Sequence, residues 1–312
     1  MKIVVTGALG HIGSYLTRRL PIFFPECEVV MIDNLATQRY ASLFDLPDKC
    51  KYKFVEDDVT KMELEPVFEG AVAVIQLAAI TDATSSFDNA DEVERVNFTA
   101  TERVANACIR TGAPMIMASS TSVYGTHKNQ VDEDCSPEEL KPQSPYAETK
   151  LKEEALTRAK CKEGLNGIIF RYGTIFGVSP GMRFHTAVNK FCWQSVMGTP
   201  LTVWKTAYDQ KRPYLYLDDC VRAIAFVIEK ELWDGRVYNV VSENCTVRNV
   251  VDAIKLQIPT IGVSFVDHKI MNQLSYEVLN TRMEKLGFRS QNSLRKGIRE
   301  TIKILENANT SY

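Results

Sequence analysis

Three glycines that follow a short apolar strand limit the fold of this chain more than any other feature. Residues Lys2–Thr6 form a predicted strand, and Gly7, Gly10 and Gly13 follow it at G-x-x-G-x-x-G spacing. Apolar residues then recur at helical spacing between positions 12 and 20. Glycine allows the backbone to turn tightly and to approach a neighbouring group closely. A strand that turns at once into a helix begins a β-α-β unit, which predicts a parallel sheet.

The rest of the first half repeats this alternation of strands and helices. Long helices are predicted at 90–111 and 143–161. Near-continuous apolar strands are typical of a sheet that is buried on both faces. We therefore expect an α/β fold with a doubly wound parallel sheet of the Rossmann type. The further strands are predicted at 28–33, 53–59, 71–79, 114–120 and 166–172.

The second half has a less regular pattern. Segments 179–216 and 242–280 have broken periodicity, and between them residues 218–230 read as a helix. Residues 294–305 are predicted to form a closing helix. We expect residues 1–173 to form the main domain, with returns to it near 214–241. Residues 174–312 are then mainly a smaller, discontinuous C-terminal lobe.

Composition excludes several classes of protein. The 312 residues carry 37 basic and 39 acidic side chains, which is not the basic footprint of a nucleic-acid-binding protein. No stretch approaches the ~20 apolar residues of a membrane-spanning helix. The eight cysteines are scattered without a C-x-x-C pair, and the four histidines lie far apart. We expect a cytoplasmic protein with reduced, mostly buried thiols and no metal, nucleic-acid or membrane partner.

An acidic residue after the second strand gives the glycine motif a chemical meaning. Asp33 ends that strand, twenty residues after Gly13. A helix N-terminus preceded by glycines favours the negative charge of a pyrophosphate. A carboxylate at the position of Asp33 accepts hydrogen bonds from the adenosine ribose hydroxyls and repels a 2′-phosphate. The order of these elements predicts a dinucleotide site that prefers NAD to NADP; the alternative for Asp33 is a turn cap before Asn34.

Two further segments carry groups that can move a proton. Tyr146 and Lys150 are four residues apart, which places both on one face of a helix. A phenol has a pKa of ~10, and a nearby ammonium and a nicotinamide cation would lower that pKa. Ser119 and Ser120 end a predicted strand, where open α/β sheets bind ligands. Alone, these are a solvated helix face and a serine-rich turn; together with the nucleotide loop they predict hydride transfer at a carbinol.

In combination, these motifs resemble the extended short-chain dehydrogenases/reductases, and among them the NAD-dependent nucleotide-sugar epimerase/dehydratase family. The resemblance spans nearly the whole chain. Its markers are Gly7-x-x-Gly10-x-x-Gly13, Asp33-Asn34-Leu35, Asp58-Val59, Leu77-Ala78-Ala79, Asn97, Ser119-Ser120-x-x-Val123-Tyr124-Gly125, Ser144-Pro145-Tyr146-x-x-x-Lys150 and Arg212-x-x-x-x-x-Asp218-Asp219.

The resemblance implies a role for each matched position. Ser120, Tyr146 and Lys150 would be catalytic, with Tyr146 as the acid/base. Substrate would be a nucleotide-diphosphate sugar held by Arg212, and the protein would be a homodimer, as the family often is. The residues implied to bind NAD are Gly7, Gly10, His11, Ile12, Gly13, Asp33, Asn34, Leu35, Asp58, Val59, Leu77, Ala78, Ala79, Asn97, Tyr146, Lys150 and Tyr172.

Several positions depart from the family pattern. Gln76 stands where the family usually has histidine, and Gly173-Thr174 stands where it often has Phe-Asn. The usual asparagine contact to the nucleotide sugar is therefore missing, and Asn189 is the candidate to replace it. Lys269 replaces a late arginine, and it supplies charge without a bidentate fork. The alternatives for Asn189 and Lys269 are surface positions in a helix and a loop.

The residues after Ser120 distinguish between reactions of this family. Sugar 4,6-dehydratases carry an Asp-Glu pair there, and uronate decarboxylases commonly carry a glutamate, whereas this chain has Thr121 and Ser122. Elimination of water needs a positioned base and acid. Because neither residue is a carboxylate, the sequence favours a nucleotide-sugar 4-epimerase. Thr121 and Thr174 are also expected to contact the substrate. A 4-ketosugar reductase, a dehydratase and a catalytically idle NAD-binding scaffold remain alternatives.

Overall fold

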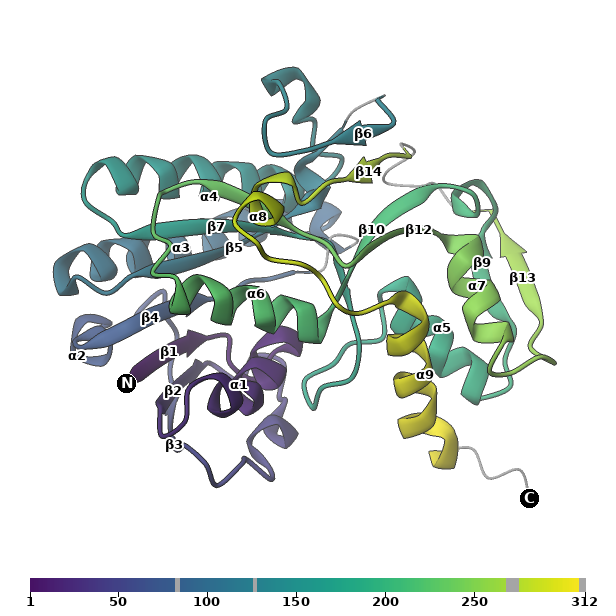
Figure 1. The fold of residues 1–312 in the computed structure, drawn as a ribbon, viewed down its shortest axis with the longest axis horizontal. Helices are drawn as coiled ribbons and strands as arrows, with labels where there is room; N and C mark the ends of the chain where they lie inside the picture. The colour runs from purple at the N-terminus through teal and green to yellow at the C-terminus, as the bar shows by residue number, and fades with distance from the viewer. Residues whose placement is uncertain (82–84, 126–127, 268–274, 309–312) are drawn as a thin grey trace.

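Seven parallel strands form the central sheet of the computed structural model, which describes residues 1–81, 85–125, 128–267 and 275–308 (Figure 1). The strand order is β11-β7-β5-β4-β1-β2-β3, so the order reverses between β1 and β4. Ligands bind at such a reversal, outside the carboxyl ends of the strands. The strands are β1 (Lys2–Thr6), β2 (Glu28–Asp33), β3 (Lys51–Glu56), β4 (Ala71–Gln76), β5 (Met115–Ser120), β7 (Gly167–Tyr172) and β11 (Val237–Val240).

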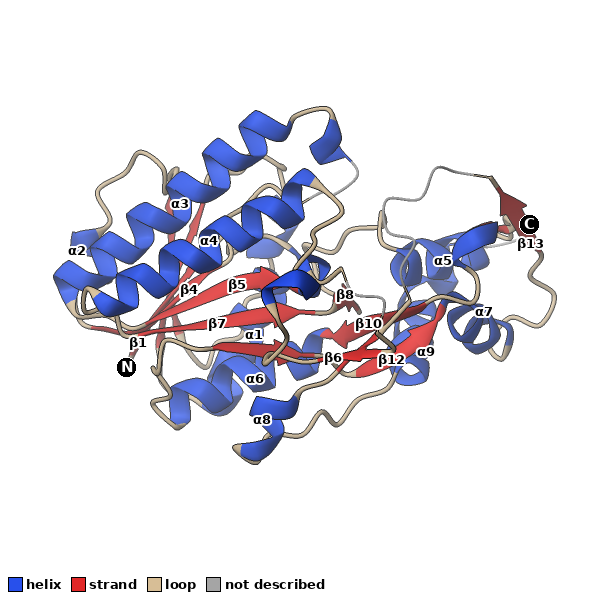
Figure 2. Ribbon diagram, turned by 90° about the horizontal axis from the view of Figure 1, so that it is seen from above, coloured by secondary structure: helices blue, strands red, loops and turns tan. Residues whose placement is uncertain are grey.

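Helices cover both faces of this sheet (Figure 2). On one face, α1 (His11–Phe23) and α6 (Leu217–Glu229) pack their apolar side chains against the strands in one core cluster. On the other face, α3 (Ala90–Thr111) and α4 (Pro145–Lys162) lie side by side, and the short α2 (Glu65–Phe68) packs near them. Burial on both faces explains the near-continuous apolar strands. The prediction of a doubly wound α/β fold is confirmed.

Most of the remaining elements gather around a separate core cluster beyond the carboxyl edge of the sheet, whereas β6 and β14 share a small cluster of their own and α8 packs against the main sheet (Figure 1). The chain leaves the main sheet after β7 and returns to it with α6 and β11, so this smaller lobe is discontinuous. The boundary at residue 173 stays a prediction. The further elements are β6 (Gln130–Val131), β8 (Thr174–Phe176), β9 (Leu201–Trp204), β10 (Lys211–Tyr216), β12 (Glu243–Thr246), β13 (Val263–Val266), β14 (Glu277–Val278), α5 (Ala187–Val196), α7 (Val247–Lys255), α8 (Thr281–Lys285) and α9 (Leu294–Leu305).

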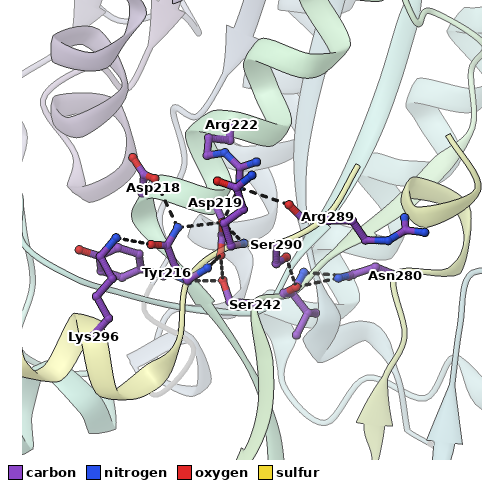
Figure 3. A network of polar contacts seen from close by, with 12 residues as sticks. Tyr216, Asp218, Asp219, Arg222, Ser242, Asn280, Arg289, Ser290 and Lys296 are labelled. Carbon is purple, nitrogen blue, oxygen red and sulfur yellow. Dashed lines mark hydrogen bonds and ion pairs between the residues drawn. The ribbon is translucent and has the colours of Figure 1, made fainter. Parts of the chain in front are cut away.

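A buried aspartate ties the start of α6 to the chain before α9 (Figure 3). Asp219 accepts hydrogen bonds from Ser242 Oγ at 2.7 Å and from the backbone N–H of Gln291 at 2.9 Å. Arg222 pairs with the same carboxylate at 3.0 Å, and Asn292 donates to it through its amide at 2.9 Å. A buried charge needs such partners. The Asp219 of the sequence motif therefore joins the main sheet to the smaller lobe.

One expectation about the cysteines is wrong. Cys27 and Cys50 form a disulfide, with their Cα atoms 5.3 Å apart. These residues immediately precede β2 and β3, and the two strands are parallel neighbours, so the first residues of both strands lie side by side. A separation of 23 residues in the sequence concealed this proximity. The other six cysteines are free thiols, four of them buried.

Two predicted strands have different ends in the structure. The strand expected at 53–59 is β3, Lys51–Glu56, and the strand expected at 71–79 ends at Gln76. Leu77, Ala78 and Ala79 continue the apolar run but lie in the loop after β4. In the described part of the chain, no helix is both long and apolar enough to cross a membrane.

Candidate active site

The glycine loop lies at the carboxyl end of β1, against the loop that follows β4. Gly7 has a φ of +62°, and a Cβ there would lie 2.7 Å from the backbone nitrogen of Ala78. A Cβ on Gly13 would lie 2.5 Å from the carbonyl oxygen of Gly7. Real Cβ atoms do not approach backbone this closely, so both positions require glycine. The loop therefore lies where the strand order reverses.

The first turn of α1 offers its backbone N–H groups to a ligand. Gly10 is the N-cap, and within the described residues no side chain caps this helix and its first turn holds no acidic residue. Uncapped N–H groups and the positive end of the helix dipole bind anions such as a pyrophosphate. A Cβ on Gly10 would meet little except the carbonyl oxygen of Gly7 at 3.2 Å. This cradle fits the diphosphate of NAD.

Asp33 holds the backbone on both sides of the proposed adenosine site. The backbone N–H of Leu9 donates to its Oδ2, and the N–H of Leu35 donates to its Oδ1, each at 3.0 Å. The turn-cap interpretation and the nucleotide interpretation of Asp33 are therefore compatible. Arg39 lies close by, because the charge of Asp33 acts on it and its Nη1 is 3.8 Å from the position of a Cβ on Gly10. A cation thus stands beside the carboxylate that was expected to select NAD.

The loop after β4 is anchored by side chains that the sequence had singled out. Gln76 Nε2 donates to the carbonyl of Ala78 at 3.0 Å, and the Thr6 hydroxyl accepts hydrogen bonds from Leu77 and Ala78. Asn97, fully buried on α3, bonds both the N–H and the carbonyl of Ile80. Asn97 therefore orients this loop through the backbone of Ile80. The glutamine at 76 thus has a structural role where the family usually has histidine.

The loop after β3 carries the residues expected to flank the adenine. The Asp58 carboxylate accepts hydrogen bonds from the N–H and the hydroxyl of Thr60. Burial alone would raise the pKa of Asp58, but these bonds outweigh it and lower that pKa. Arg103 on α3 donates to the carbonyl of Val59 at 3.2 Å. The Asp58-Val59 pair is therefore held in place by both its own loop and α3.

The three predicted catalytic residues lie at the end of β5 and in the first turns of α4. Ser120 ends β5, and its Oγ accepts a hydrogen bond from Ser122 Oγ at 2.9 Å. Tyr146 and Lys150 lie on α4, which Ser144 caps and Pro145 begins. The Lys150 Nζ is 5.8 Å from the centre of the Tyr146 ring. Ser119 donates to Glu154 on α4 at 2.6 Å, so the end of β5 meets this helix directly.

The pKa of Tyr146 differs from the expected direction. The protein's own groups raise this pKa, because burial penalises the phenolate and Glu153 repels it. Lys150 and Arg183 lower the pKa, as expected for nearby cations, but burial outweighs them. The sequence argument considered the ammonium and not the desolvation of the phenol.

Lys150 is itself paired with a carboxylate that sequence reasoning missed. Its Nζ lies 3.1 Å from Glu153 Oε2, and both side chains are almost fully buried. Burial lowers the pKa of Lys150, but Glu153 and Tyr146 more than offset this effect, so the pKa is raised. The Thr101 hydroxyl on α3 donates to Glu153 Oε1 at 2.6 Å. The i, i+3 spacing of Lys150 and Glu153 on a predicted helix was the available signal.

A second buried ion pair holds α4 against the sheet. Glu154 Oε1 and Oε2 accept hydrogen bonds from Arg171 Nε and Nη2 on β7, at 2.8 and 2.7 Å. Arg171 also lies over the ring of Tyr124, 4.8 Å from its centre. Paired, two-pronged contacts of this kind fix orientation as well as charge. The helix that carries Tyr146 and Lys150 therefore has a defined position on the sheet.

Most side chains expected at the substrate bond to the protein itself. Thr121 is buried, and its hydroxyl donates to the carbonyl of Tyr172 at 3.2 Å. Asn189 is fully buried, and its amide bonds the N–H of Gly177 and the carbonyl of Arg183. The Tyr172 side chain lies in the core on the α1 and α6 side. Their direct contacts to ligands stay predictions.

The other substrate residues have less constrained positions. Thr174 begins β8 and is half-buried, opposite Tyr214 of β10. Arg212, near the start of β10, donates to Gln210 Oε1 at 2.6 Å, and burial lowers its pKa. Lys269 lies outside the described residues. Within the described residues, no cluster of side chains has the make-up of a metal site.

The segment 177–183 lies directly over the start of α1, which the sequence did not indicate. A Cβ on Gly181 would lie 2.2 Å from the carbonyl oxygen of Leu9. His11 Nε2 lies 2.8 Å from the carbonyl oxygen of Gly177, and burial lowers the pKa of His11 to about 4. Arg183, from the same segment, is near enough to Tyr146 and His11 to lower the pKa of both. The site is therefore bordered by a cation from the smaller lobe.

Known proteins share both this sequence pattern and this fold. A family model described as the NAD dependent epimerase/dehydratase family matches residues 3–240. An uncharacterized UDP-glucose epimerase of Bacillus subtilis (strain 168), YtcB, is 32% identical over 269 residues, which cover 82% of this chain and 81% of that protein.

Two further relatives show the range of the similarity. The trifunctional UDP-glucose 4,6-dehydratase/UDP-4-keto-6-deoxy-D-glucose 3,5-epimerase/UDP-4-keto-L-rhamnose-reductase RHM1 of Arabidopsis thaliana is 27% identical over 96% of this chain, but the match spans only 46% of that protein. The crystal structure of the UDP-glucuronic acid 4-epimerase from Bacillus cereus, with UDP-glucuronic acid and NAD, superposes with a TM-score of 0.88 at 25% identity. It covers 99% of this chain and 100% of that one.

The motifs, the strand order and the matches agree. The family match covers most of the chain, from the glycine loop to the last strand of the main sheet. The expectation of an NAD-dependent enzyme related to nucleotide-sugar epimerases and dehydratases is confirmed. The chain belongs to the NAD-dependent epimerase/dehydratase family.

Proposed function

We propose that this protein is an NAD-dependent 4-epimerase of nucleotide-diphosphate sugars. The observation that carries the proposal is the chemistry of positions 121 and 122, which follow the catalytic-site serine. Thr121 turns its hydroxyl toward the carbonyl of Tyr172, and Ser122 bonds Ser120. Elimination of water needs a base and an acid beside the sugar. Two hydroxyl side chains, one of them turned away, do not provide that pair.

Epimerisation needs only the groups that the site brings together. NAD, held by the glycine loop and Asp33, would supply a hydride acceptor at C4 of the sugar and a hydride donor to the opposite face of that carbon. Tyr146 takes the proton from O4 and later gives it back, while the Ser120 hydroxyl donates a hydrogen bond to the same oxygen. The Lys150 ammonium stabilises the Tyr146 phenolate and orients the ribose hydroxyls. The 4-keto sugar turns over between the two transfers.

The substrate class follows from charge and from similarity. Arg212 presents a planar guanidinium, which suits the oxygens of a diphosphate. Similarity to proteins named for UDP-glucose and UDP-glucuronic acid makes UDP the first nucleotide to test. Arg183, near Tyr146, adds a second cation on the side of the sugar. We also propose that the protein is a homodimer, which light scattering of the purified protein will test.

A dehydratase is the competing function, because the Arabidopsis relative is named for a 4,6-dehydratase activity. The hydroxyls at positions 121 and 122 argue against it. A 4-ketosugar reductase would consume one reduced cofactor in each turnover. An epimerase returns every hydride within one closed cycle, so it needs no added cofactor.

Proton NMR of the purified protein with UDP-glucose, UDP-glucuronic acid and UDP-N-acetylglucosamine, without added cofactor, tests the proposal. We expect the C4 epimer of at least one sugar and no lasting NADH absorbance. Tyr146→Phe is the matched inactive control. A 4-keto-6-deoxy product would show a dehydratase instead. Conversion of a supplied 4-keto sugar with stoichiometric loss of NAD(P)H would show a reductase. GDP-, CDP- and dTDP-sugars extend the test if UDP-sugars do not react.

A further inference from the structure

The carboxylate of Glu153 is buried beside the catalytic lysine, yet the proposed mechanism makes no use of it. Glu153 is only 1% exposed, and it lies one helical turn after Lys150 on α4. Its two oxygens lie 3.2 and 3.1 Å from the Lys150 Nζ. Glu153 is not part of the Tyr146-x-x-x-Lys150 motif. A buried carboxylate at this place has a direct electrostatic effect on the groups that transfer the proton.

We propose that Glu153 is a positioning residue that holds the Lys150 ammonium toward α3 and so limits how strongly that ammonium stabilises a Tyr146 phenolate. The inference rests on the roles proposed above for Tyr146 and Lys150. The geometry supports it because Thr101 of α3 donates to the Glu153 oxygen that also contacts Lys150. The ammonium is thus shared between a carboxylate within 3.2 Å and a phenol ring centred 5.8 Å away.

Few other charges face this pair. On α4 itself, Glu154 adds a second carboxylate, but Arg171 of β7 binds both of its oxygens. The α3 helix contributes Thr101 and β5 contributes Ser119, and neither side chain carries a charge. The segment before α5 contributes Arg183, which favours the phenolate of Tyr146. Among the groups that act on Tyr146, Glu153 is the one carboxylate in the described residues that opposes its ionisation.

The charge balance gives the direction of the effect. Glu153 repels a phenolate and partly neutralises the ammonium that attracts it, so it raises the pKa of Tyr146. The Glu153→Gln change removes that charge and keeps an oxygen that accepts the Thr101 hydrogen bond. The Lys150 charge then acts on Tyr146 without compensation, so the phenolate forms at lower pH. Glu153 therefore sets the pH range in which the enzyme works.

Two readouts test this effect on the full-length, NAD-loaded protein. The first is a pH titration of tyrosinate ultraviolet absorbance, with the same titration of Tyr146→Phe subtracted to isolate Tyr146. The second is the pH profile of kcat/KM for the sugar that NMR identifies. For Glu153→Gln we expect the Tyr146 transition and the acid limb of the profile to move to lower pH. The ratio of activity at acid pH to plateau activity then rises severalfold.

Control variants separate this role from a structural one. Glu94 is an exposed carboxylate on α3 that pairs with Lys152, and Glu94→Gln should leave both readouts unchanged. Glu153→Asp restores the charge and should return the transition toward the wild-type pH. It also serves as the test variant, with a smaller shift, if Glu153→Gln does not fold.

Each outcome has one meaning. A folded Glu153→Gln protein whose Tyr146 transition stays in place, or moves to higher pH, overturns the inference. If the wild type converts no nucleotide sugar, the proposed function fails, and the absorbance titration still decides the role of Glu153. If the Tyr146 transition moves and the acid limb does not, Glu153 acts on Tyr146 as inferred, and Tyr146 is not the base of the reaction.

Discussion

The two sides of the active site are built on different principles. On the side of β1 and α1, the groups proposed to bind NAD are backbone N–H groups, which glycines and Asp33 arrange. On the side of the segment 177–183, the arrangement depends on side chains such as Asn189, whose amide holds the backbone on both sides of that segment. The first side depends on local spacing, whereas the second depends on contacts between distant parts of the chain.

This difference decides what a side chain near the site can be expected to do. A glycine at the right spacing has few alternative roles, because a Cβ would collide with the backbone. An asparagine has two hydrogen-bonding groups that any nearby backbone can take up. Asn189 was expected to contact the sugar, but in the structure its side-chain amide forms hydrogen bonds with backbone groups of the protein. Position in a motif is thus better evidence that a residue contributes its backbone to a binding site than that it contributes its side chain.

The largest effect is expected from the buried ion pair that holds α4 against β7. Glu154→Gln leaves Arg171, which is 2% exposed, without its ionised partner. Breaking a buried pair in this way costs about 3–5 kcal/mol. Urea unfolding should show this loss. Arg248→Gln, which breaks an exposed pair with Asp209 in the smaller lobe, is the control and should leave the midpoint nearly unchanged. Equal losses would contradict the contrast between the two regions.

The contact between His11 and Gly177 joins the two sides, and burial of the His11 imidazole should make the fold less stable in acid. The pKa of His11 is about 4 in the folded protein, below its ordinary value of 6.5, because of burial. The folded state therefore binds fewer protons than the unfolded chain, and stability declines as pH falls from 6.5 toward 4. Linkage gives a maximum loss of about 3 kcal/mol, as an order of magnitude.

His11→Gln isolates this contribution, because glutamine does not titrate and its amide can donate to the same carbonyl. Urea unfolding at several pH values should show a shallower decline below pH 6.5 for the variant than for the wild type. Parallel declines would mean that other groups cause the acid sensitivity and that the buried His11 does not contribute to it.

Much of the first side was predictable from the sequence, and the reason is local. The glycine spacing, Asp33 and the Tyr146/Lys150 pair each depend on positions within one strand, one turn or one helix. Glu153 was missed although it lies on the same helix, because nothing local shows that it is buried. The Cys27–Cys50 disulfide was missed because the order of the strands in the sheet brings the two cysteines together. Arg183 was missed because its segment folds back over the start of α1. Lys269 lies outside the described residues, so its role stays a prediction.

Tyr146, at the start of α4, provides the sharpest test of catalysis. Tyr146→Phe removes the group that transfers the proton and should lower kcat by roughly 10²-fold or more, the usual scale of acid–base catalysis. Thermal unfolding and NAD affinity should change little, because phenylalanine keeps the aromatic ring and the backbone N–H that donates to Ser86 Oγ. Steady-state kinetics with the identified sugar provide the measurement. Near-normal turnover would remove Tyr146 from the mechanism.

Asn189 provides the opposite case on the second side. Asn189→Ala leaves the N–H of Gly177 and the carbonyl of Arg183 without their buried partner. Unsatisfied buried groups cost about 1–3 kcal/mol each, less where water can enter, so we expect a loss of about 2 kcal/mol in stability. Thermal and urea unfolding measure this loss. A variant with normal stability but a strongly raised KM would instead support the direct sugar contact expected from the sequence.

The smallest effect concerns the choice between NAD and NADP. Asp33 should make NAD(H) bind at least about ten-fold tighter than NADP(H), which corresponds to about 1.4 kcal/mol. The Asp33 carboxylate repels a 2′-phosphate, whereas the nearby guanidinium of Arg39 would attract a 2′-phosphate. Asp33→Ala should therefore narrow the gap, through weaker NAD binding and tighter NADP binding.

Because Asp33 also bonds Leu9 and Leu35, Asp33→Asn is the control that keeps an acceptor while it removes the charge. Titration calorimetry with both cofactors separates the two contributions. If the asparagine variant narrows the gap as much as the alanine variant, charge sets the preference. If only the alanine variant narrows the gap in affinity, the effect comes from the loss of loop structure. The preference for NAD then depends on the backbone conformation that Asp33 holds.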